Sequence, residues 1–222
     1  MVSPLITSKS KSEILNLIDR QNNKAEVDKY GEVFTPPLLV NTIYNNMGKY
    51  SLWKNQGTTL LDPAAGIGHF TVHAYYRLMD SLEDAIPNKR KRSKHIIENM
   101  LYMVELNPEN CEILRSLFGR KANIFCGSFL NSSLNAINPE VFPGLIFTII
   151  VGNPPYQQER PVTTGTNAGR KTLWDKFALI SLSILKPRGY LAFIHPAGWR
   201  APGGRHSYLW KALTAKQMLF LQ

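Results

Sequence analysis

Short apolar segments alternate with helical patterns along most of this chain, and no other feature constrains the fold as much. The segments that look like strands are short and apolar, at 58–63, 100–106, 122–127, 145–152 and 189–196. Between and after them, apolar residues recur at helical spacing, at about 68–82, 108–118, 171–186 and 205–216. Apolar strands separated by helices are typical of a parallel sheet that is covered on both faces. The sequence therefore predicts an α/β fold with a mostly parallel sheet.

The beginning of the chain has a different pattern. Residues 11–30 start as a short amphipathic helix and then become polar. We therefore expect an N-terminal helical and polar segment at 1–30 and a single larger domain at 31–222. A chain of 222 residues can bury a real core, since a domain of this size hides roughly 70% of its unfolded surface.

The balance of charged residues points to a class of partner. The net charge is +10 and the isoelectric point is about 9.6, which suits a polyanion such as nucleic acid or an acidic membrane surface. A basic protein without such a partner would have the same charge. No apolar run approaches the ~20 residues that span a bilayer, and the N-terminus lacks the apolar core of a signal peptide.

Cysteine and histidine residues give no sign of a metal site. Cys111 and Cys126 do not form a CxxC pair, so we expect reduced thiols in a cytosolic protein. The five histidines form no pattern with the cysteines that suggests a metal site, and we expect no bound metal.

The segment "LLDPAAGIGHF" at 60–70 is the first candidate for a binding site. A strand ends at Asp62, a turn with Gly66 follows, and a helix opens near Gly68. Glycines permit a tight turn and a close backbone approach, and a helix N-terminus attracts an anion. A plain connection between a strand and a helix has the same pattern, so the segment is weak support by itself.

An acidic residue ends the next strand. Glu105 lies in "YMVELNP", where a carboxylate can accept hydrogen bonds from two ribose hydroxyls, as in nucleotide-binding α/β folds. A solvated acid at a strand end is the alternative. The basic run within 86–95 makes the separation from Asp62 longer than in the compact dinucleotide fingerprint.

The segment "VGNPPYQ" at 151–157 follows a buried strand and carries the most specific chemistry. Pro154 and Pro155 stiffen the turn and remove two N–H donors. The Asn153 side chain and the Pro154 carbonyl offer two acceptors to one NH2 group, and Tyr156 offers a stacking face. Holding both hydrogens of a conjugated NH2 group would favour its attack as a nucleophile. A proline-rich turn that only ends a core strand is the alternative.

Taken together and in this order, the motifs resemble the gamma-class N6-adenine DNA methyltransferases, which use S-adenosylmethionine. "DPAAGIGHF", "VFTPP" and "NPPY" match the family's glycine loop, its upstream segment and its catalytic motif, and 173–199 matches the following helix, strand and turn. The resemblance covers about residues 28–210. It implies a Rossmann-like class I methyltransferase fold, a DNA partner, adenine methylation in restriction and modification, and a cytoplasmic place in a bacterium or a phage host.

The resemblance also implies roles for individual residues. Phe34 and Thr35 would contact the methionine end of the cofactor, and Glu105 would hold its ribose. Asn153, Pro154, Pro155 and Tyr156 would form the catalytic turn, with Asn153 also beside the cofactor. The rest of the cofactor pocket would comprise Asp62, Pro63, Ala64, Gly66, Gly68, Ser128 and Phe129. Thr35 could also cap a helix that begins with Pro36 and Pro37.

Two departures from the family pattern affect these expectations. Ser128 stands where the family often has an aspartate that contacts the cofactor adenine, and a hydroxyl is the weaker partner. Phe129 either packs against that adenine or belongs to the core. The sequence ends at 218–222, in what reads as the start of a strand, so we expect the closing strand and the target-recognition domain to be missing or supplied by a partner.

Several segments outside the motifs have expected positions. We expect 157–170 to lie at the catalytic edge, as a segment that closes over substrate or as a simple connector. We expect 86–95 to be a basic loop that faces away from that edge, as a solvated charge run. Trp199 and Arg200 are better placed to approach DNA. Leu173, Trp174, Phe177 and Ile180 share one helix face and are expected to form core.

Three functional hypotheses follow. The first is N6-adenine methylation of a flipped-out DNA base. The second is methylation of a protein glutamine, whose side-chain NH2 poses the same chemical problem. The third is a methyltransferase fold that binds without turnover. The order of the motifs and the positive charge favour the first.

Overall fold

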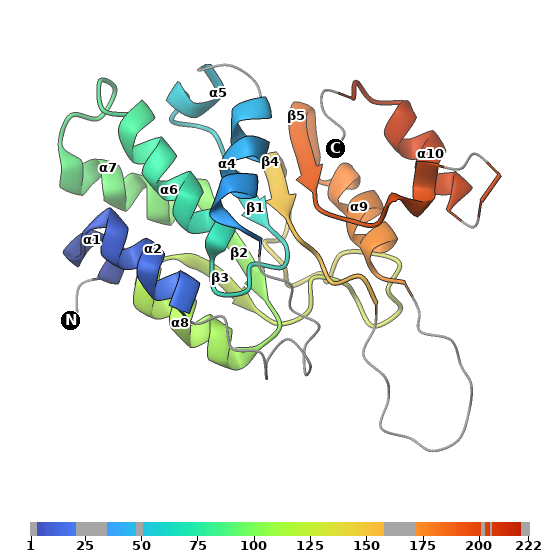
Figure 1. Cartoon of the computed structure of the whole chain (residues 1–222), viewed down its shortest axis with the longest axis horizontal. Coiled ribbons are helices and arrows are strands. Elements are labelled where there is room, and N and C mark those ends of the chain that lie inside the picture. Colours follow the sequence, from blue (N-terminus) through green and yellow to red (C-terminus); the bar gives the residue numbers. More distant parts are fainter. Residues whose placement is uncertain are drawn as a thin grey trace.

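The computed structural model describes residues 4–20, 35–47, 51–157, 172–200, 203–204 and 206–218, and its centre is one parallel sheet (Figure 1). The strand order is β3-β2-β1-β4-β5, and every neighbouring pair is parallel. The strands are β1 (Leu60–Asp62), β2 (Leu101–Glu105), β3 (Asn123–Cys126), β4 (Phe147–Gly152) and β5 (Leu185–Phe193). The chain progresses outward from β1 in both directions, so the order reverses between β1 and β4. Ligands bind beside such a reversal in open α/β sheets.

Helices cover both faces of the sheet, as predicted. One face is covered by α1 (Leu5–Ser8), α2 (Lys11–Arg20), α4 (Pro37–Asn46), α6 (His69–Ser81) and α8 (Pro108–Phe118). The other face is covered by α9 (Trp174–Ser183) and the segment after β3. Successive residues of β1 point to opposite faces of the sheet. Leu60 packs in the hydrophobic cluster with α6 and α8, and Leu61 packs in the cluster with α9. Beyond α9 lies α10 (Ser207–Thr214), at the right of Figure 1.

The first twenty residues share the core of the larger domain. Ile6, Ile14 and Ile18 are buried in the same cluster as the residues of α6 and α8. Gly119 ends α8 at φ +86°, and a Cβ there would lie 2.8 Å from the Pro4 side chain. The boundary that we predict between residues 30 and 31 lies outside the described residues and stays a prediction.

The expectation for Thr35 as a helix cap was wrong. Helix α4 begins at Pro37, and its cap residue is Pro36, which makes no side-chain cap hydrogen bond. Pro36 is extended, with ψ at 141°, because a residue that precedes proline avoids the helical region. Pro37 can nevertheless occupy the first turn, where its missing N–H would have had no helical partner.

The basic segment 86–95 is a helix rather than the loop that we expected. Helix α7 spans Lys89–His95 and is followed by a π-helical turn at Ile96–Met100. The Asn88 side chain accepts a hydrogen bond from the Lys91 N–H at 2.9 Å, which caps the first turn. Arg92 is buried and donates to the Ile86 carbonyl at 2.7 Å. The Asn88 cap and the hydrogen bond of the buried Arg92 therefore both stabilise this helix against repulsion between its positive charges.

The position of α7 agrees with the expectation that its charges face away from the catalytic edge. The His95 ring nitrogen Nε2 lies 2.9 Å from the carbonyl oxygen of Gln56, which precedes β1 in the short helix-turn that follows α5 (Ser51–Lys54). Both α7 and this turn therefore lie at the amino ends of the strands.

The expectation of two reduced thiols was also wrong. Cys111, in the first turn of α8, forms a disulfide with Cys126, the last residue of β3. The two Cα atoms are 6.0 Å apart, within the usual range for a disulfide. Helix α8 starts at the carboxyl end of β2, beside the carboxyl end of β3, and this proximity is a property of the fold that cysteine spacing does not reveal.

Candidate active site

The carboxyl ends of three neighbouring strands bring the main predicted residues to one edge of the sheet. Asp62 ends β1, Glu105 ends β2, and Asn153 follows the last residue of β4. Because β2, β1 and β4 are adjacent, their ends form one continuous row. The predicted catalytic turn and the predicted cofactor loop therefore lie side by side.

The glycine loop after β1 depends on backbone geometry that favours glycine. Gly66 has φ +54° and Gly68 has φ +96°, both in the left-handed region. A Cβ at Gly68 would also lie 2.9 Å from a methyl group of Leu114 in α8. A Cβ at Gly66 would meet nothing within 4 Å. The loop is thus packed tightly at one glycine and open at the other.

Glu105 links the glycine loop to the end of β2. Its Oε2 accepts a hydrogen bond from the Gly66 N–H at 2.7 Å, and its Oε1 accepts one from the Asn107 N–H at 2.7 Å. The side chain is 7% exposed. Burial raises the pKa of the Glu105 carboxyl, and the backbone N–H groups of Asn107, Gly66 and Leu106 and the Asn110 side chain oppose that rise.

Asp62 is enclosed between the loop and the catalytic turn. It is 1% exposed, and its Oδ1 accepts a hydrogen bond from the Ala64 N–H at 3.2 Å. Its Oδ2 is buried without a hydrogen-bond partner among the described residues. Burial is the largest cause that raises the pKa of Asp62 to about 8, with a further rise from Glu105. A Cβ at Gly152 would lie 2.7 Å from Asp62 Oδ1, so this carboxyl fits only against a glycine.

The turn that follows β4 presents side chains of different burial. Pro154 is buried, while Asn153, Pro155 and Tyr156 are partly buried. The Tyr156 carbonyl accepts a hydrogen bond from the Leu173 N–H at 3.1 Å, which ties the turn to the start of α9. Burial raises the pKa of the Tyr156 phenol, so its ring stays neutral at physiological pH. The turn is therefore anchored at its far end, and Asn153 is partly exposed although its side-chain oxygen is buried.

The remaining predicted cofactor residues are less central. Ser128 Oγ donates to the Leu130 carbonyl at 2.8 Å, so its hydroxyl belongs to a local turn. Phe129 is 2% exposed and packs on Phe177, with ring centroids 5.2 Å apart, which places it in the core. Thr35 is buried, and Phe34 lies outside the described residues. Contacts of Ser128, Phe129, Phe34 and Thr35 with a cofactor stay predictions.

An aromatic cluster behind Tyr156 was missed by sequence reasoning. Trp174, Ala178, Trp199 and Leu209 form it, and Tyr156 packs against it. Trp199 is 2% exposed, so the expectation that it approaches DNA was wrong, because its indole fills the space between α9 and α10. Arg200 is exposed. The pairing of these residues depends on tertiary contacts, so no spacing in the sequence signals it.

Other predicted elements near the edge have mixed outcomes. Trp174, Phe177 and Ile180 of α9 are buried, as predicted. Of the segment 157–170, only Gln157 is described; it forms an antiparallel bridge with Thr172. Within the described ranges, no group of three histidine, cysteine, aspartate or glutamate side chains could hold a metal ion. No helix in those ranges is long and apolar enough to cross a bilayer.

Comparison with known families identifies the chain. Residues 99–219, more than half of the sequence, match the model of the Eco57I restriction-modification methylases. The chain belongs to this family. The matched region contains Glu105, the predicted catalytic turn at 153–156 and the aromatic cluster.

One curated relative and several solved structures are similar to this chain. An uncharacterised adenine-specific methylase of Mycoplasma pneumoniae is 25% identical to this chain. The match covers 85% of this chain and 58% of that protein. A modification subunit of a type I restriction enzyme from Vibrio vulnificus is similar with a TM-score of 0.60, at 18% identity, over 92% of this chain and 44% of that one. The EcoKI M protein is similar with a TM-score of 0.58, at 20% identity, over 80% of this chain and 37% of that one. The α/β Rossmann-like methyltransferase fold is therefore confirmed.

Proposed function

We propose that this chain transfers a methyl group from S-adenosylmethionine to the N6 amino group of adenine in DNA. One observation carries the proposal: Glu105, Asp62 and Asn153 meet at the ends of three adjacent strands, so a cofactor site and an amino-group site share one edge. Membership of the Eco57I methylase family and the net charge of +10 support DNA as the substrate. The chain spans little more than half of its curated relative, so the activity of the whole protein is part of the proposal.

The residues present fit S-adenosylmethionine. The open space beside Gly66 allows a ligand to approach the backbone of the loop. The buried, unpartnered Oδ2 of Asp62 suits a ligand that carries positive charge. Glu105 would hold the ribose hydroxyls, and the start of α6 would face the methionine carboxylate. Asp62, Pro63, Ala64, Gly66 and Gly68 would shape the pocket. When bound, the cofactor supplies an electrophilic methyl group.

The catalytic turn would act on the amino group of the base. The Asn153 side-chain oxygen and the Pro154 carbonyl would accept the two N6 hydrogens, which favours a tetrahedral nitrogen and spreads the positive charge that develops there. Pro155 would keep the turn stiff, and Tyr156 would stack on the purine. Transfer would then be direct and would require no protein nucleophile. Because a paired base cannot reach this turn, the adenine would be flipped out of the duplex.

Transfer of a tritiated methyl group to mixed duplex DNA, followed by nucleoside analysis, tests the proposal. The expected product is N6-methyladenine in DNA. Label in 5-methylcytosine, or in a glutamine side chain of an added protein but not in DNA, would contradict it. If calorimetry shows cofactor binding but no acceptor is methylated, the fold binds without turnover and the proposal is wrong for this chain alone.

A further inference from the structure

A buried aspartate of α9 is connected to the proposed catalytic turn through a series of aromatic rings. Asp175 is 1% exposed and follows Trp174, whose indole belongs to the cluster that contacts Tyr156. Asp175 lies 22 residues after Asn153 in the sequence, and none of the roles described above uses it. The burial of this carboxylate is therefore not explained by the roles proposed for the other residues.

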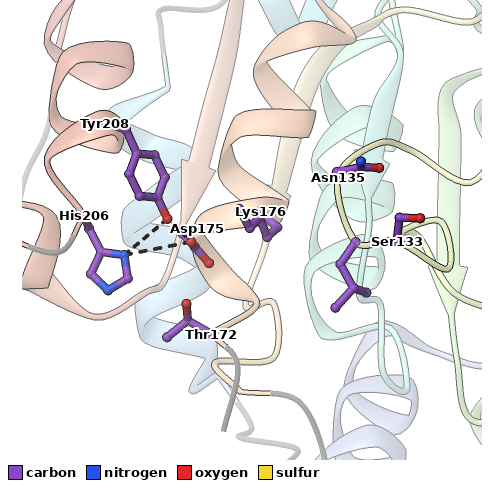
Figure 2. A pocket seen from close by; sticks show the side chains of 8 residues that line it. Ser133, Asn135, Thr172, Asp175, Lys176, His206 and Tyr208 are labelled. Carbon is purple, nitrogen blue, oxygen red and sulfur yellow. Dashed lines mark hydrogen bonds and ion pairs between the residues drawn. The ribbon is translucent and has the colours of Figure 1, made fainter. Parts of the chain in front are cut away.

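Asp175 holds the start of α10 against α9. Its Oδ2 accepts a hydrogen bond from the Tyr208 hydroxyl, and His206 Nδ1 lies 3.9 Å from the same oxygen. Figure 2 shows the three side chains converging at one side of a pocket of about 360 Å³. Its Oδ1 is buried and accepts no hydrogen bond from the described residues. A carboxylate loses much hydration when it is buried, so the contacts with Tyr208 and His206 compensate for that loss.

The contact continues from His206 to the ring that backs the catalytic turn. The rings of His206 and Trp174 have centroids 4.9 Å apart, and Trp174 stacks on His195 at 5.2 Å with the planes only 5° from parallel. His195 in turn lies 6.1 Å from Trp199. Tyr156 packs against the cluster of Trp174 and Trp199. The chain of contacts therefore runs from Asp175 to the ring that would stack on the target base.

We propose that Asp175 is a positioning residue for methyl transfer, which orients Tyr156 by holding His206 and Tyr208 and thereby fixing the Trp174 cluster. This inference rests on the proposed function, because it assigns to Tyr156 the role of stacking on the flipped adenine. Asp175 does not contact substrate or cofactor. Its Oδ2 is already held by the Tyr208 hydroxyl and lies beside His206, which favours a positioning role over a binding site in the adjacent pocket.

The test compares Asp175→Ala and Asp175→Asn with the whole protein. Asp175→Ala should lower kcat for DNA methylation roughly ten- to a hundredfold, because small misplacement of a reacting group has effects of this size. Cofactor affinity by calorimetry should change less than about twofold, since the contacts of the Asp175 carboxylate are with Tyr208 and His206 and not with the glycine loop. Asp175→Asn keeps an acceptor for the Tyr208 hydroxyl and should recover part of the rate. Asp80→Asn, a change at an exposed aspartate of α6, serves as the matched control.

A fluorescent base gives a readout that simple destabilisation would not change. DNA with 2-aminopurine at the target position should show stronger emission with Asp175→Ala than with the natural protein, because the flipped base would stack less on Tyr156. Thermal unfolding is measured in parallel, and the rates and emission are compared at a temperature where every variant is folded. Unchanged kcat and unchanged emission in Asp175→Ala would overturn the positioning role.

Failure of the proposed function would be recognised separately. If the natural protein methylates no DNA, the ¹⁹F signal of a 3-fluorotyrosine at position 156 tests the same connection without activity. This signal should shift in Asp175→Ala and stay in place in Asp80→Asn. A signal that does not move in Asp175→Ala would overturn the inference whatever the substrate is.

Discussion

Asp62 shows how burial of a single residue can couple ligand binding to protons. Its carboxyl is closed in by the glycine loop and by Gly152, and the resulting pKa of about 8 lies far above the ordinary value of 3.8. The free protein therefore keeps this group protonated near neutral pH, although its surroundings are suited to a cationic ligand. The proton must leave before the charge of the carboxylate can act on such a ligand.

This coupling predicts a pH-dependent affinity for S-adenosylmethionine. A cationic ligand favours the ionised form of Asp62, so binding should release a proton, and affinity should increase as the pH rises toward about 8. Calorimetry in buffers of different ionisation enthalpy counts the released protons. Asp62→Asn should remove the pH dependence of binding. Proton uptake on binding, or a pH-independent affinity in the natural protein, would contradict this prediction.

The same pKa predicts the pH trend of stability. Because the folded-state value exceeds the unfolded value of 3.8, the unfolded state loses its proton first as the pH rises. The contribution of Asp62 to stability is thus fully present below pH 3.8 and is lost as the pH rises through about 8. Denaturant unfolding of the natural protein and of Asp62→Asn, compared between pH 6 and pH 9, measures this difference. The free energy of unfolding of the natural protein, relative to that of Asp62→Asn, should be higher at pH 6 than at pH 9.

Asn153 and Glu105 should separate transfer from binding. Asn153→Ala should abolish methyl transfer while cofactor affinity changes little, since only the acceptor of the N6 hydrogens is lost. Glu105→Ala should weaken cofactor binding roughly ten- to a hundredfold, because hydrogen bonds to a charged group contribute about 1.5–3 kcal/mol. It also leaves the Gly66 N–H without its acceptor. Equal loss of cofactor affinity in both variants, measured by calorimetry, would contradict these roles.

Motif reasoning identified the residues of this edge but not how they hold one another. The positions of Asp62, Glu105 and Asn153 at strand ends follow from apolar runs and could be predicted. The hydrogen bond from Gly66 to Glu105 joins residues 39 positions apart, and the contact of Tyr208 with Asp175 joins residues 33 apart. Such contacts depend on how the helices and strands pack, and the spacing of residues in the sequence does not predict them.

At the scale of elements, β5 shows why boundaries are harder to predict than the elements themselves. We predicted a strand at 189–196, and the structure has it at Leu185–Phe193. The strand includes Pro187, although proline cannot donate to a sheet ladder. The pairing with β4 shifts register between Phe147 and Ile149, and Arg188 adopts φ +62°. This irregularity accommodates the proline, and it arises from pairing with the neighbouring strand.

The cap of α7 offers a test of why a basic run becomes helical. Asn88→Ala removes the hydrogen bond to the Lys91 N–H and should lower the free energy of unfolding by about 1 kcal/mol. Asn88→Asp keeps a capping oxygen and should lose much less. Urea unfolding measures both. Because α7 lies at the amino ends of the strands, cofactor binding should be equal in the two variants, and a selective loss of binding in Asn88→Ala would contradict this placement.

At the scale of the whole molecule, the parallel sheet with helices on both faces could be predicted and the place of the N-terminal helices could not. Periodicity indicates that residues 11–20 form a helix with one apolar face, but it does not say which surface receives that face. The structure places Ile14 and Ile18 in the same core cluster as the buried residues of α6 and α8. The N-terminal segment is therefore part of the domain's core rather than an appendage to it.

Removal of this segment should destabilise the entire domain. Burial of an isoleucine contributes about 1.5–3 kcal/mol, and a domain is stable by only about 5–15 kcal/mol. A chain without residues 1–20 should therefore unfold at a much lower temperature or fail to fold. Ile14→Ala is the finer test, with an expected loss of about 2–5 kcal/mol. Lys11→Ala, at an exposed position of the same helix, is the control, and equal stability of the two variants would contradict the shared core.

The location of α7 also affects how the protein should be handled in the laboratory. Its exposed cations, Lys89, Arg90, Lys91 and Lys94, lie at the amino ends of the strands, whereas the candidate active site lies at the carboxyl ends. A heparin column would hold the molecule by these lysines and this arginine. Elution salt would then be the same for the natural protein and for Asn153→Ala. Chromatographic retention is thus a convenient purification step for this protein and a poor assay of its substrate.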